Sequence, residues 1–461
     1  MDLVILSRIQ FALNISFHFI YPPLSIGIGL FLVILEGLHL ITKDERYHKL
    51  ARFWVKIFAL TFALGVSTGL VQAFAFGTNW ARYSRYVGDV FGSALAAEGV
   101  FAFFLESGFL GVLLFGWDKV KPWVHFFATV MVSVGAHFSA VWIIIANSWM
   151  QTPAGHRIVG TGANARAEIT DFWAMVFNPS AMDRLVHVLL GCWLAGAFFV
   201  LSVACYYLVK KRHTDLAMTM VKIAMPFALI VLLAQLASGD SSAKLVAKYQ
   251  PAKLAAMEGI YETKPYTPIS VAGWVDTKNE KVYSLKIPGG LSLLTYHNPE
   301  TPVTGLDKFP KKDWPNVAAV FQFYHMMVAM WGVMFLIACL GVYYLWKKKL
   351  QDKKWLLWTF VFAVAFPQIA LQTGWYTAEM GRQPWVVYNL LRTSHGVSKS
   401  VAPTQVLGSI TMFVFIYILF FTLFIFLLDR KIKHGPEDGG PDEDADLYST
   451  IYPPKDKEDD K

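Results

Sequence analysis

An apolar run, "LLWTFVFAVAFPQIALQT" (residues 356–373), leads directly into the stretch "GWYTAEMGRQPW" (residues 374–385). The run predicts a membrane-spanning helix, because about 20 apolar residues cross the hydrocarbon core of a bilayer. The stretch that follows brings Glu379, Arg382 and Gln383 close together among aromatic side chains. Three interpretations compete for it: a turn at a membrane surface, a structural ion pair, or a ligand set for a buried group.

Apolar runs of this kind recur along the whole chain. Of its 461 residues, 55% are hydrophobic and 16% are charged, whereas soluble proteins carry about 25% charged residues. We expect an all-α, polytopic bundle, because a lone helix satisfies its backbone hydrogen bonds inside lipid. Nine spans are predicted near residues 11–40, 54–77, 91–116, 123–148, 184–210, 219–238, 317–346, 355–376 and 404–428.

The charges indicate topology and not nucleic-acid binding. Although the formal net charge is +8, Lys and Arg gather in short connections between spans. Connections rich in these residues stay in the cytoplasm. The richer set contains Lys43/Arg46/Lys49, Lys119/Lys121, Lys210/Lys211/Arg212, Lys347/Lys348/Lys349 and Arg430/Lys431/Lys433. The chain is therefore predicted to begin outside and to end in the cytoplasm.

The spans divide the chain into four parts. Residues 1–238 are predicted to form a six-span bundle, and residues 317–428 a three-span bundle. Residues 239–316 are polar and lie outside by this topology; so long a connection is usually functional or a linker. Residues 429–461 form an acidic tail rich in Pro and Gly, which is expected to be disordered.

Ionisable groups inside the spans are costly, so each asks for an explanation. Five such groups lie in the predicted spans or at their ends: His18, Glu98, Glu106, His187 and Glu379. Glu98 and Glu106 share the third span, and the other three lie on separate spans. Isolated His and Met ligands from different helices suit haem iron, whereas zinc requires ligands that converge at short spacing. His125 and His137, also in the membrane, are expected to make ordinary interhelical hydrogen bonds.

Two further patterns carry chemistry. Glu98 and Glu106 are eight residues apart, which is about 80° of rotation on an α-helix, so both acids can face one bundle interior. A proton route is favoured over a pair of neutral, hydrogen-bonded acids. Arg8, Arg382 and Arg392 near the outer ends suit the carboxylates of a haem, because Arg binds carboxylates bidentately; snorkelling to headgroups is the alternative.

Taken together, these residues resemble subunit I of the cytochrome bd quinol oxidases. Nearly the whole chain shares the resemblance. The segments that carry it include "SRIQFALNISFHFIYPPLS" (7–25), "RLVHVLLGCWLAGAFF" (184–199), "PAKLAAMEGIYET" (251–263) and "GRQPW" (381–385). The compact outer loop resembles that of the short-loop members.

The resemblance implies a role for individual positions. His18 matches the haem d ligand, His187 and Met327 the ligands of a low-spin haem b, and Glu379 the ligand of a high-spin haem b. Glu98, Glu106, Ser107 and Ser139 match positions assigned to proton delivery. Lys253 and Glu258 match the quinol site. Five further residues are expected to line the haems or to pair with their carboxylates: Arg8, Arg382, Gln383, Trp375 and Trp385.

The implied activity is that of a terminal respiratory oxidase of the bacterial cytoplasmic membrane. It oxidises quinol at the outer side and reduces dioxygen to water at three haems, generating a proton motive force without pumping. Its implied partners are a second oxidase subunit and, in some members, small single-span peptides. Some members have an arginine where this chain has His325. His325 and Met326 therefore compete with Met327 as candidate ligands of the low-spin haem.

Two other functions remain open from the residues alone. A di-haem quinol dehydrogenase anchor would carry two low-spin haems and would take up no oxygen. A proton-coupled transporter that uses Glu98 and Glu106 would be colourless.

Overall fold

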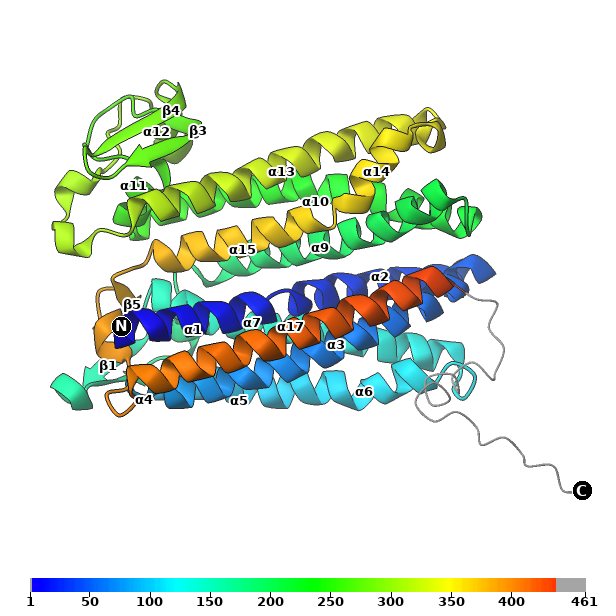
Figure 1. The fold of residues 1–461 in the computed structure, drawn as a ribbon, viewed down its shortest axis with the longest axis horizontal. Coiled ribbons are helices and arrows are strands. Elements are labelled where there is room, and N and C mark those ends of the chain that lie inside the picture. Colours follow the sequence, from blue (N-terminus) through cyan, green and yellow to red (C-terminus); the bar gives the residue numbers. More distant parts are fainter. Residues whose placement is uncertain (1, 437–461) are drawn as a thin grey trace, which may run out of the picture.

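The fold is a bundle of long, roughly parallel helices, as the computed structural model of residues 2–436 shows (Figure 1). Within these residues, nine helical segments are long and apolar enough to cross a membrane, which confirms the predicted number. Their bounds are α1–α2 (Leu3–His18, Tyr21–Thr42), α3 (Glu45–Thr78), α5–η1–α6 (Gly88–Ala97, Glu98–Phe103, Phe104–Phe115), α7 (Pro122–Gln151), α9 (Ala181–Lys210), α10 (Thr214–Tyr249), α13 (Val317–Trp346), α14–α15 (Lys354–Phe362, Ala365–Met380) and α17 (Pro403–His434).

Several helices extend past their predicted ends. Helix α10 continues to Tyr249, so the polar connection that was predicted to begin at residue 239 begins later. Helix α17 continues to His434, so the start of the predicted tail at residue 429 is helical. The prediction of disorder for the remainder of the tail falls on residues 437–461, which lie outside the described residues.

Prolines interrupt the first and eighth spans. Proline has no N–H group, and its ring clashes with the carbonyl group four residues earlier. Pro22 and Pro23 follow the end of α1, so this helix stops at His18 and α2 begins at Tyr21. In the eighth span, Pro367 comes four residues after Ala363, the residue that caps the end of α14 at Phe362.

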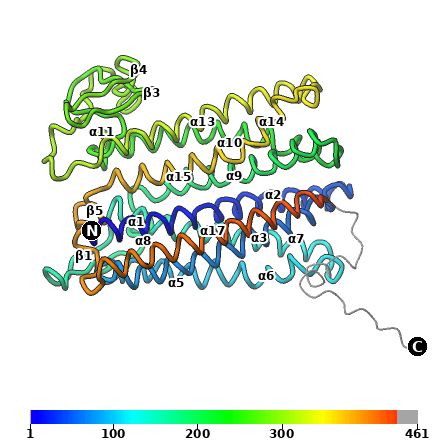
Figure 2. Tube along the Cα trace, in the orientation of Figure 1, coloured from blue at the N-terminus to red at the C-terminus, as the bar shows by residue number. Residues whose placement is uncertain are grey.

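The short elements gather at one end of the bundle. Three two-stranded antiparallel sheets lie there (Figure 1): β1 (His156–Val159) with β2 (Arg166–Ile169), β3 (Ile269–Asp276) with β4 (Lys281–Ile287), and β5 (Trp385–Val387) with β6 (Leu391–Arg392). The same end holds the short helices α4 (Ala81–Tyr86), α8 (Phe172–Val176), α11 (Pro251–Glu258), α12 (Gly290–Tyr296) and α16 (Thr393–Gly396). The basic connections lie at the other end, as the trace in Figure 2 shows.

The core is centred on α9 and on the helices that pack against it, chiefly α2 and α10. The closest approach brings Gly27 of α2 against Gly196 of α9. A Cβ atom built on Gly196 would lie 2.5 Å from the carbonyl carbon of Gly27. Small residues permit such approaches, and close packing drives helix association in membranes, where no water has to be excluded.

This contact gives a direct test of the packing. We expect Gly196→Ala to destabilise the assembled protein by about 1–3 kcal/mol, because the new methyl group meets backbone that cannot turn away. Gly77→Ala on α3 is the matched control, since a Cβ atom there meets nothing within 4 Å. Thermal unfolding of the purified complex measures both variants. Equal midpoints for Gly196→Ala and the unchanged protein would contradict the packing described here.

Candidate haem and quinol site

Glu379 lies at the centre of a polar network near the end of α15. Its Oε1 atom accepts hydrogen bonds from Asn147 Nδ2 at 3.0 Å and from Gln151 Nε2 at 3.2 Å. Its Oε2 atom pairs with Arg382, one helical turn further along the chain. Arg382 is only 3% exposed. The stretch that raised three interpretations is therefore neither a plain surface turn nor an isolated ion pair.

Two more cations join this network from other elements. Lys253 of α11 donates to Gln151 Oε1 at 2.5 Å and to Gln250 Oε1 at 2.6 Å. Arg184 of α9 donates to Asn147 Oδ1. Burial, with Arg184 and Arg382 nearby, holds the pKa of Lys253 well below its usual value. Arg184, Asn147 and Gln151 were not singled out from the sequence as site residues, because only the packing of α7 and α9 against α15 reveals their role.

The network holds donors that no described residue satisfies. Within residues 2–436, Arg382 Nε and Nη1 and Arg184 Nε are buried without a hydrogen-bond partner. Buried guanidinium groups without partners are costly. Bound carboxylates would relieve this cost, since guanidinium groups form paired hydrogen bonds with them. The network therefore fits the propionate groups of haem.

Gln383 and the two tryptophans lie around this network. Gln383 Oε1 accepts from the Thr393 hydroxyl group at 2.6 Å. Trp385 is covered by the guanidinium group of Arg392, 4.6 Å from the ring centroid. Trp375 packs among the aromatic side chains of α1 and α15. In contrast, Arg8 is exposed on α1, and no contact described for it joins it to the network.

His187 and Met327 occupy opposite corners of a four-helix group. Helix α9 packs against α10 and α15, and α13 packs against the same two helices, so α9 and α13 face each other diagonally. His187 Nδ1 lies 3.1 Å from the Ser238 hydroxyl group. A Cβ atom on Gly374 would lie 2.7 Å from Met327 Sδ, so this glycine makes room for the thioether. A His/Met pair held by facing helices suits haem iron.

The neighbours of Met327 are engaged elsewhere. His325 Nδ1 lies 2.8 Å from Phe321 O, and its Nε2 lies 2.9 Å from Ser270 O. Met326 is 46% exposed on the outer face of α13. Of the three candidates on this helix, Met327 is therefore the one with a free donor atom facing the helix group.

His18 is held in the form that a metal ligand requires. The Thr68 hydroxyl group donates to Leu64 O at 2.7 Å, so its oxygen is left to accept from His18 Nδ1 at 3.0 Å. A proton on Nδ1 leaves the Nε2 lone pair for a metal. Gly69 lies beside the ring, because a Cβ atom there would be 3.3 Å from His18 Cε1.

Glu98 and Glu106 both face α7. The Ser139 hydroxyl group donates to Glu98 Oε1 at 2.6 Å. Glu106 packs against Gly135, one turn earlier on α7, where an added Cβ atom would lie 2.9 Å from Glu106 Cβ. The predicted offset of about 80° assumes a regular α-helix, whereas residues 98–103 form a π-helical turn. A π-turn takes up an extra residue, so the eight-residue spacing acts like seven residues, or two full turns.

Ser107 lies on a different side from the two acids. It is exposed, and its hydroxyl group donates to the backbone carbonyl of Phe103 at 2.6 Å. The structure therefore brings Glu98, Glu106 and Ser139 together and leaves Ser107 apart from them.

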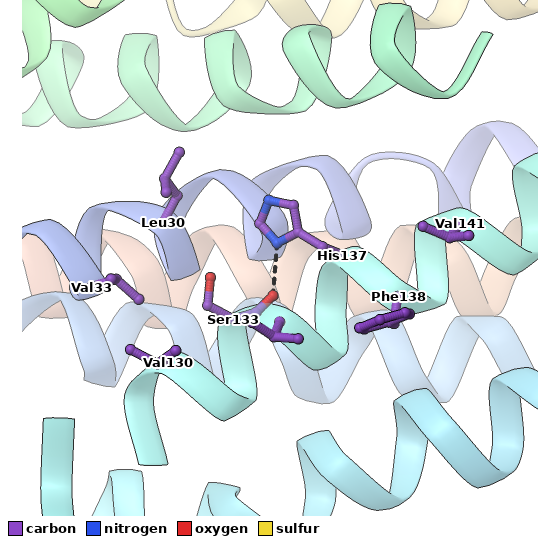
Figure 3. Close-up of a pocket in the computed structure, with 8 residues that line it drawn as sticks. Leu30, Val33, Val130, Ser133, His137, Phe138 and Val141 are labelled. Carbon is purple, nitrogen blue, oxygen red and sulfur yellow. Dashed lines mark hydrogen bonds between the residues drawn. The ribbon is translucent and has the colours of Figure 1, made fainter. Parts of the chain in front are cut away.

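His137 lies beside an apolar pocket of about 410 Å³ between α2 and α7. Its Nδ1 atom approaches the Ser133 carbonyl at 2.7 Å, as Figure 3 shows. Its Nε2 atom accepts from Trp193 at 3.0 Å. His125 binds Glu36 at 2.9 Å and is also buried. Both rings are engaged in interhelical hydrogen bonds, which supports the structural interpretation of these two histidines.

Glu258 is buried at the end of α11, on a different side from Lys253. Its Oε2 atom accepts from the backbone N–H of Ser270 at 3.0 Å, whereas Oε1 has no partner among the described residues. Burial raises the pKa of Glu258 to about 7. A carboxyl group with this pKa can exchange a proton with a ligand near neutral pH.

The comparisons with known proteins show the family of the chain. Residues 6–436 match the family described as cytochrome bd terminal oxidase subunit I. The chain is 39% identical to the cytochrome bd ubiquinol oxidase subunit 1 of Bacillus subtilis (strain 168), over 95% of each chain. It is 33% identical to the cytochrome bd-II ubiquinol oxidase subunit 1 of Escherichia coli (strain K12), over 94% of this chain and 97% of that one.

A solved structure shares the fold. The bd oxidase from Geobacillus thermodenitrificans superimposes with a TM-score of 0.88 at 30% identity, over 94% of this chain and 99% of that one. Such haem-containing oxidases pair subunit I with subunit II, and the nine apolar helices fit a multi-pass protein of the bacterial cytoplasmic membrane. The chain belongs to the cytochrome bd terminal oxidase subunit I family.

Proposed function

We propose that this chain oxidises a quinol at the outer side of the membrane and reduces dioxygen to water, together with a second oxidase subunit. Family membership supports the reaction class. The observation that carries the proposal is the polar network around Glu379, where buried guanidinium N–H groups have no partner within residues 2–436 and lie beside an iron-ligating type of side chain. Neither a simple transporter nor a structural helix bundle requires this combination.

Three haems are proposed, each held by side chains already described. His187 and Met327 would hold a low-spin haem b, Glu379 a high-spin haem b, and His18 a haem d. When bound, the haems supply the electron transfer and the oxygen chemistry, while the protein supplies ligands, orientation and a dry environment. Arg382 and Arg184 would bind propionate groups, and Arg8, Gln383, Trp375 and Trp385 are proposed to line the haems.

Quinol is proposed to bind at the outer end, near α11. Ionised Glu258 would accept a proton from a quinol hydroxyl group through its Oε1 atom, which makes no hydrogen bond within residues 2–436, while the Tyr324 hydroxyl group lies beside the carboxyl group. Lys253 would orient the quinol head group through its Nζ atom. The two residues are five positions apart on α11, which is about 140° of rotation, so they would contact different parts of the ligand.

Protons for water are proposed to come from the cytoplasm past Glu106 and then Glu98. Both carboxyl groups face α7, and Ser139 donates to Glu98. Ser107 is also proposed for this route, although its hydroxyl group is bound to backbone. Because quinol protons are released outside and water protons are taken from inside, the membrane would be charged without a pump.

A visible spectrum of the purified two-subunit complex tests the proposal. We expect low-spin b, high-spin b and d-type absorbance, together with oxygen uptake on addition of quinol. Two low-spin haems without oxygen uptake would favour a quinol dehydrogenase anchor instead. A colourless protein would favour a transporter.

Replacement of a ligand gives a sharper test. We expect His187→Ala to remove the low-spin b absorbance and to reduce quinol oxidation at least about 100-fold, because iron would lose an axial ligand that its neighbours cannot replace. His137→Gln is the matched control, since a glutamine oxygen can still accept from Trp193. Spectra of the reduced complexes measure both. An unchanged low-spin signal in His187→Ala would remove His187 from the ligand set.

The dependence of activity on pH tests Glu258. Only the ionised carboxylate accepts a proton, and its pKa is about 7. We therefore expect kcat/KM for quinol to fall about tenfold for each pH unit below 7 and to level off above it. Glu258→Gln should abolish this acidic limb and lower kcat/KM about 100-fold or more. Glu262→Gln, an exposed carboxyl group nearby, is the control. An acidic limb that persists in Glu258→Gln would assign the titration to another group.

A further inference from the structure

The hairpin formed by β3 and β4 carries an exposed apolar face. Its members are Val271, Trp274, Tyr283, Leu285 and Ile287, which are 51%, 62%, 48%, 70% and 54% exposed. We call this set the hairpin face. Trp274 pairs with Tyr283 across the two strands, and the rings stack with centroids 5.6 Å apart. Soluble surfaces rarely gather so many large apolar side chains, and such a patch usually marks a binding surface.

The opposite face of the hairpin is already used for packing. Val275 and Val282 point to this inner side, where a Cβ atom on Gly259 would meet both at 3.5 Å and 2.5 Å. Ser270 also contributes its hydroxyl group to Ser284 at 3.0 Å. Strand residues alternate between faces, so the hairpin face points away from this contact. Its exposure is therefore not a result of a loosely placed hairpin.

The hairpin is attached to the side of α13. Gln322 Nε2 donates to Gly273 O at 2.9 Å, and His325 Nε2 lies 2.9 Å from Ser270 O. Figure 1 shows the strands beside the outer end of α13, displaced laterally from the bundle. With 30 residues, α13 is about 45 Å long, whereas the hydrocarbon core is about 30 Å thick. Gln322 and His325 lie in the first three turns of α13, which reach the membrane boundary when the span is centred in the bilayer.

The contact also lies on the stripe of α13 that faces outward. Gln322, Met326, Ala329, Val333 and Leu336 recur at helical spacing and are all exposed. Met326 and Leu336 are 46% and 60% exposed. Lipid is the natural environment of such an apolar stripe on a membrane span. The hairpin contacts Gln322, at the first position of this stripe. The hairpin face therefore continues the apolar surface that α13 presents to lipid.

We propose that the hairpin face rests in the outer leaflet, at the boundary between lipid headgroups and acyl chains. Tryptophan and tyrosine are enriched at this depth because one end of each ring system is apolar and the other is polar. Leu285, Ile287 and Val271 would contact the upper acyl chains. Lys281 has the same parity as Tyr283 and Leu285 on β4, is exposed, and can reach headgroup phosphates.

The proposal gives the hairpin a role in the quinol reaction, and this part rests on the function proposed above. Ser270, at the start of β3, donates its backbone N–H to Glu258 and offers its carbonyl group to His325. The strand that contacts lipid is thus the strand that holds the proposed proton acceptor. A lipid-soluble quinol would meet Glu258 at the depth at which it already travels.

Spin labels on the intact complex test the lipid contact without relying on activity. The complex is placed in nanodiscs of phosphatidylcholine and phosphatidylglycerol, without quinol, and is labelled at Leu285→Cys in a Cys339→Ser background. Cys192 and Cys205 are buried and do not react. Lys278→Cys, exposed in the turn of the same hairpin, is the matched control. Power saturation compares access of dissolved oxygen with access of a water-soluble nickel chelate.

We expect the label at position 285 to favour oxygen over the nickel chelate severalfold more than the label at position 278. Equal nickel access at both positions would place the hairpin face in water and overturn the proposal. Low access of both reagents at position 285 alone would indicate a protein partner and would also overturn it. If Leu285→Cys fails to assemble, Ile287→Cys provides the same comparison. A complex that passes this test but lacks oxidase activity would refute only the proposed function.

Discussion

The Glu379 carboxylate links several helices at the end of the bundle that carries the short sheets. It accepts hydrogen bonds from Asn147 and Gln151 of α7 and pairs with Arg382 beyond α15. Through these amides it is linked to Arg184 of α9 and Lys253 of α11. A single carboxylate thus stands among three basic side chains in a region largely shielded from water, where charges that lack partners are costly. Further negative groups are required to complete such a site, and haem propionates have this chemistry.

Irregular turns place several of the candidate side chains. His18 is the last residue of α1, at the break that Pro22 and Pro23 impose. Glu98 begins a π-helical turn, and both Glu98 and Glu106 contact α7. In a membrane, a break in helical hydrogen bonding is tolerated only where other protein groups or a cavity surround it. These two departures from regular helix thus coincide with candidate site residues, His18 and Glu98.

Much of the fold follows from the sequence, because bilayer thickness and backbone hydrogen bonding restrict the choices. The nine spans were predicted from apolar length alone and are confirmed within residues 2–436. The π-turn that begins at Glu98 was not predicted, since nothing in the local sequence distinguishes a π-turn from an α-turn. Asn147 and Gln151 were missed for a different reason: an amide near the end of an apolar run looks like any other polar cap until another helix packs beside it.

The sequence likewise left three candidates for the ligand on α13, and helix geometry separates them. Neighbouring residues on a helix differ by about 100°, so His325, Met326 and Met327 point in three directions. Met326 points to the outer stripe, and both ring nitrogens of His325 face carbonyl oxygens, one of which belongs to the hairpin. Met327 alone points to Gly374, where the missing side chain leaves room for its sulfur atom. Helix α13 therefore holds the hairpin through Gln322 and His325 and carries the proposed haem ligand Met327 on another side.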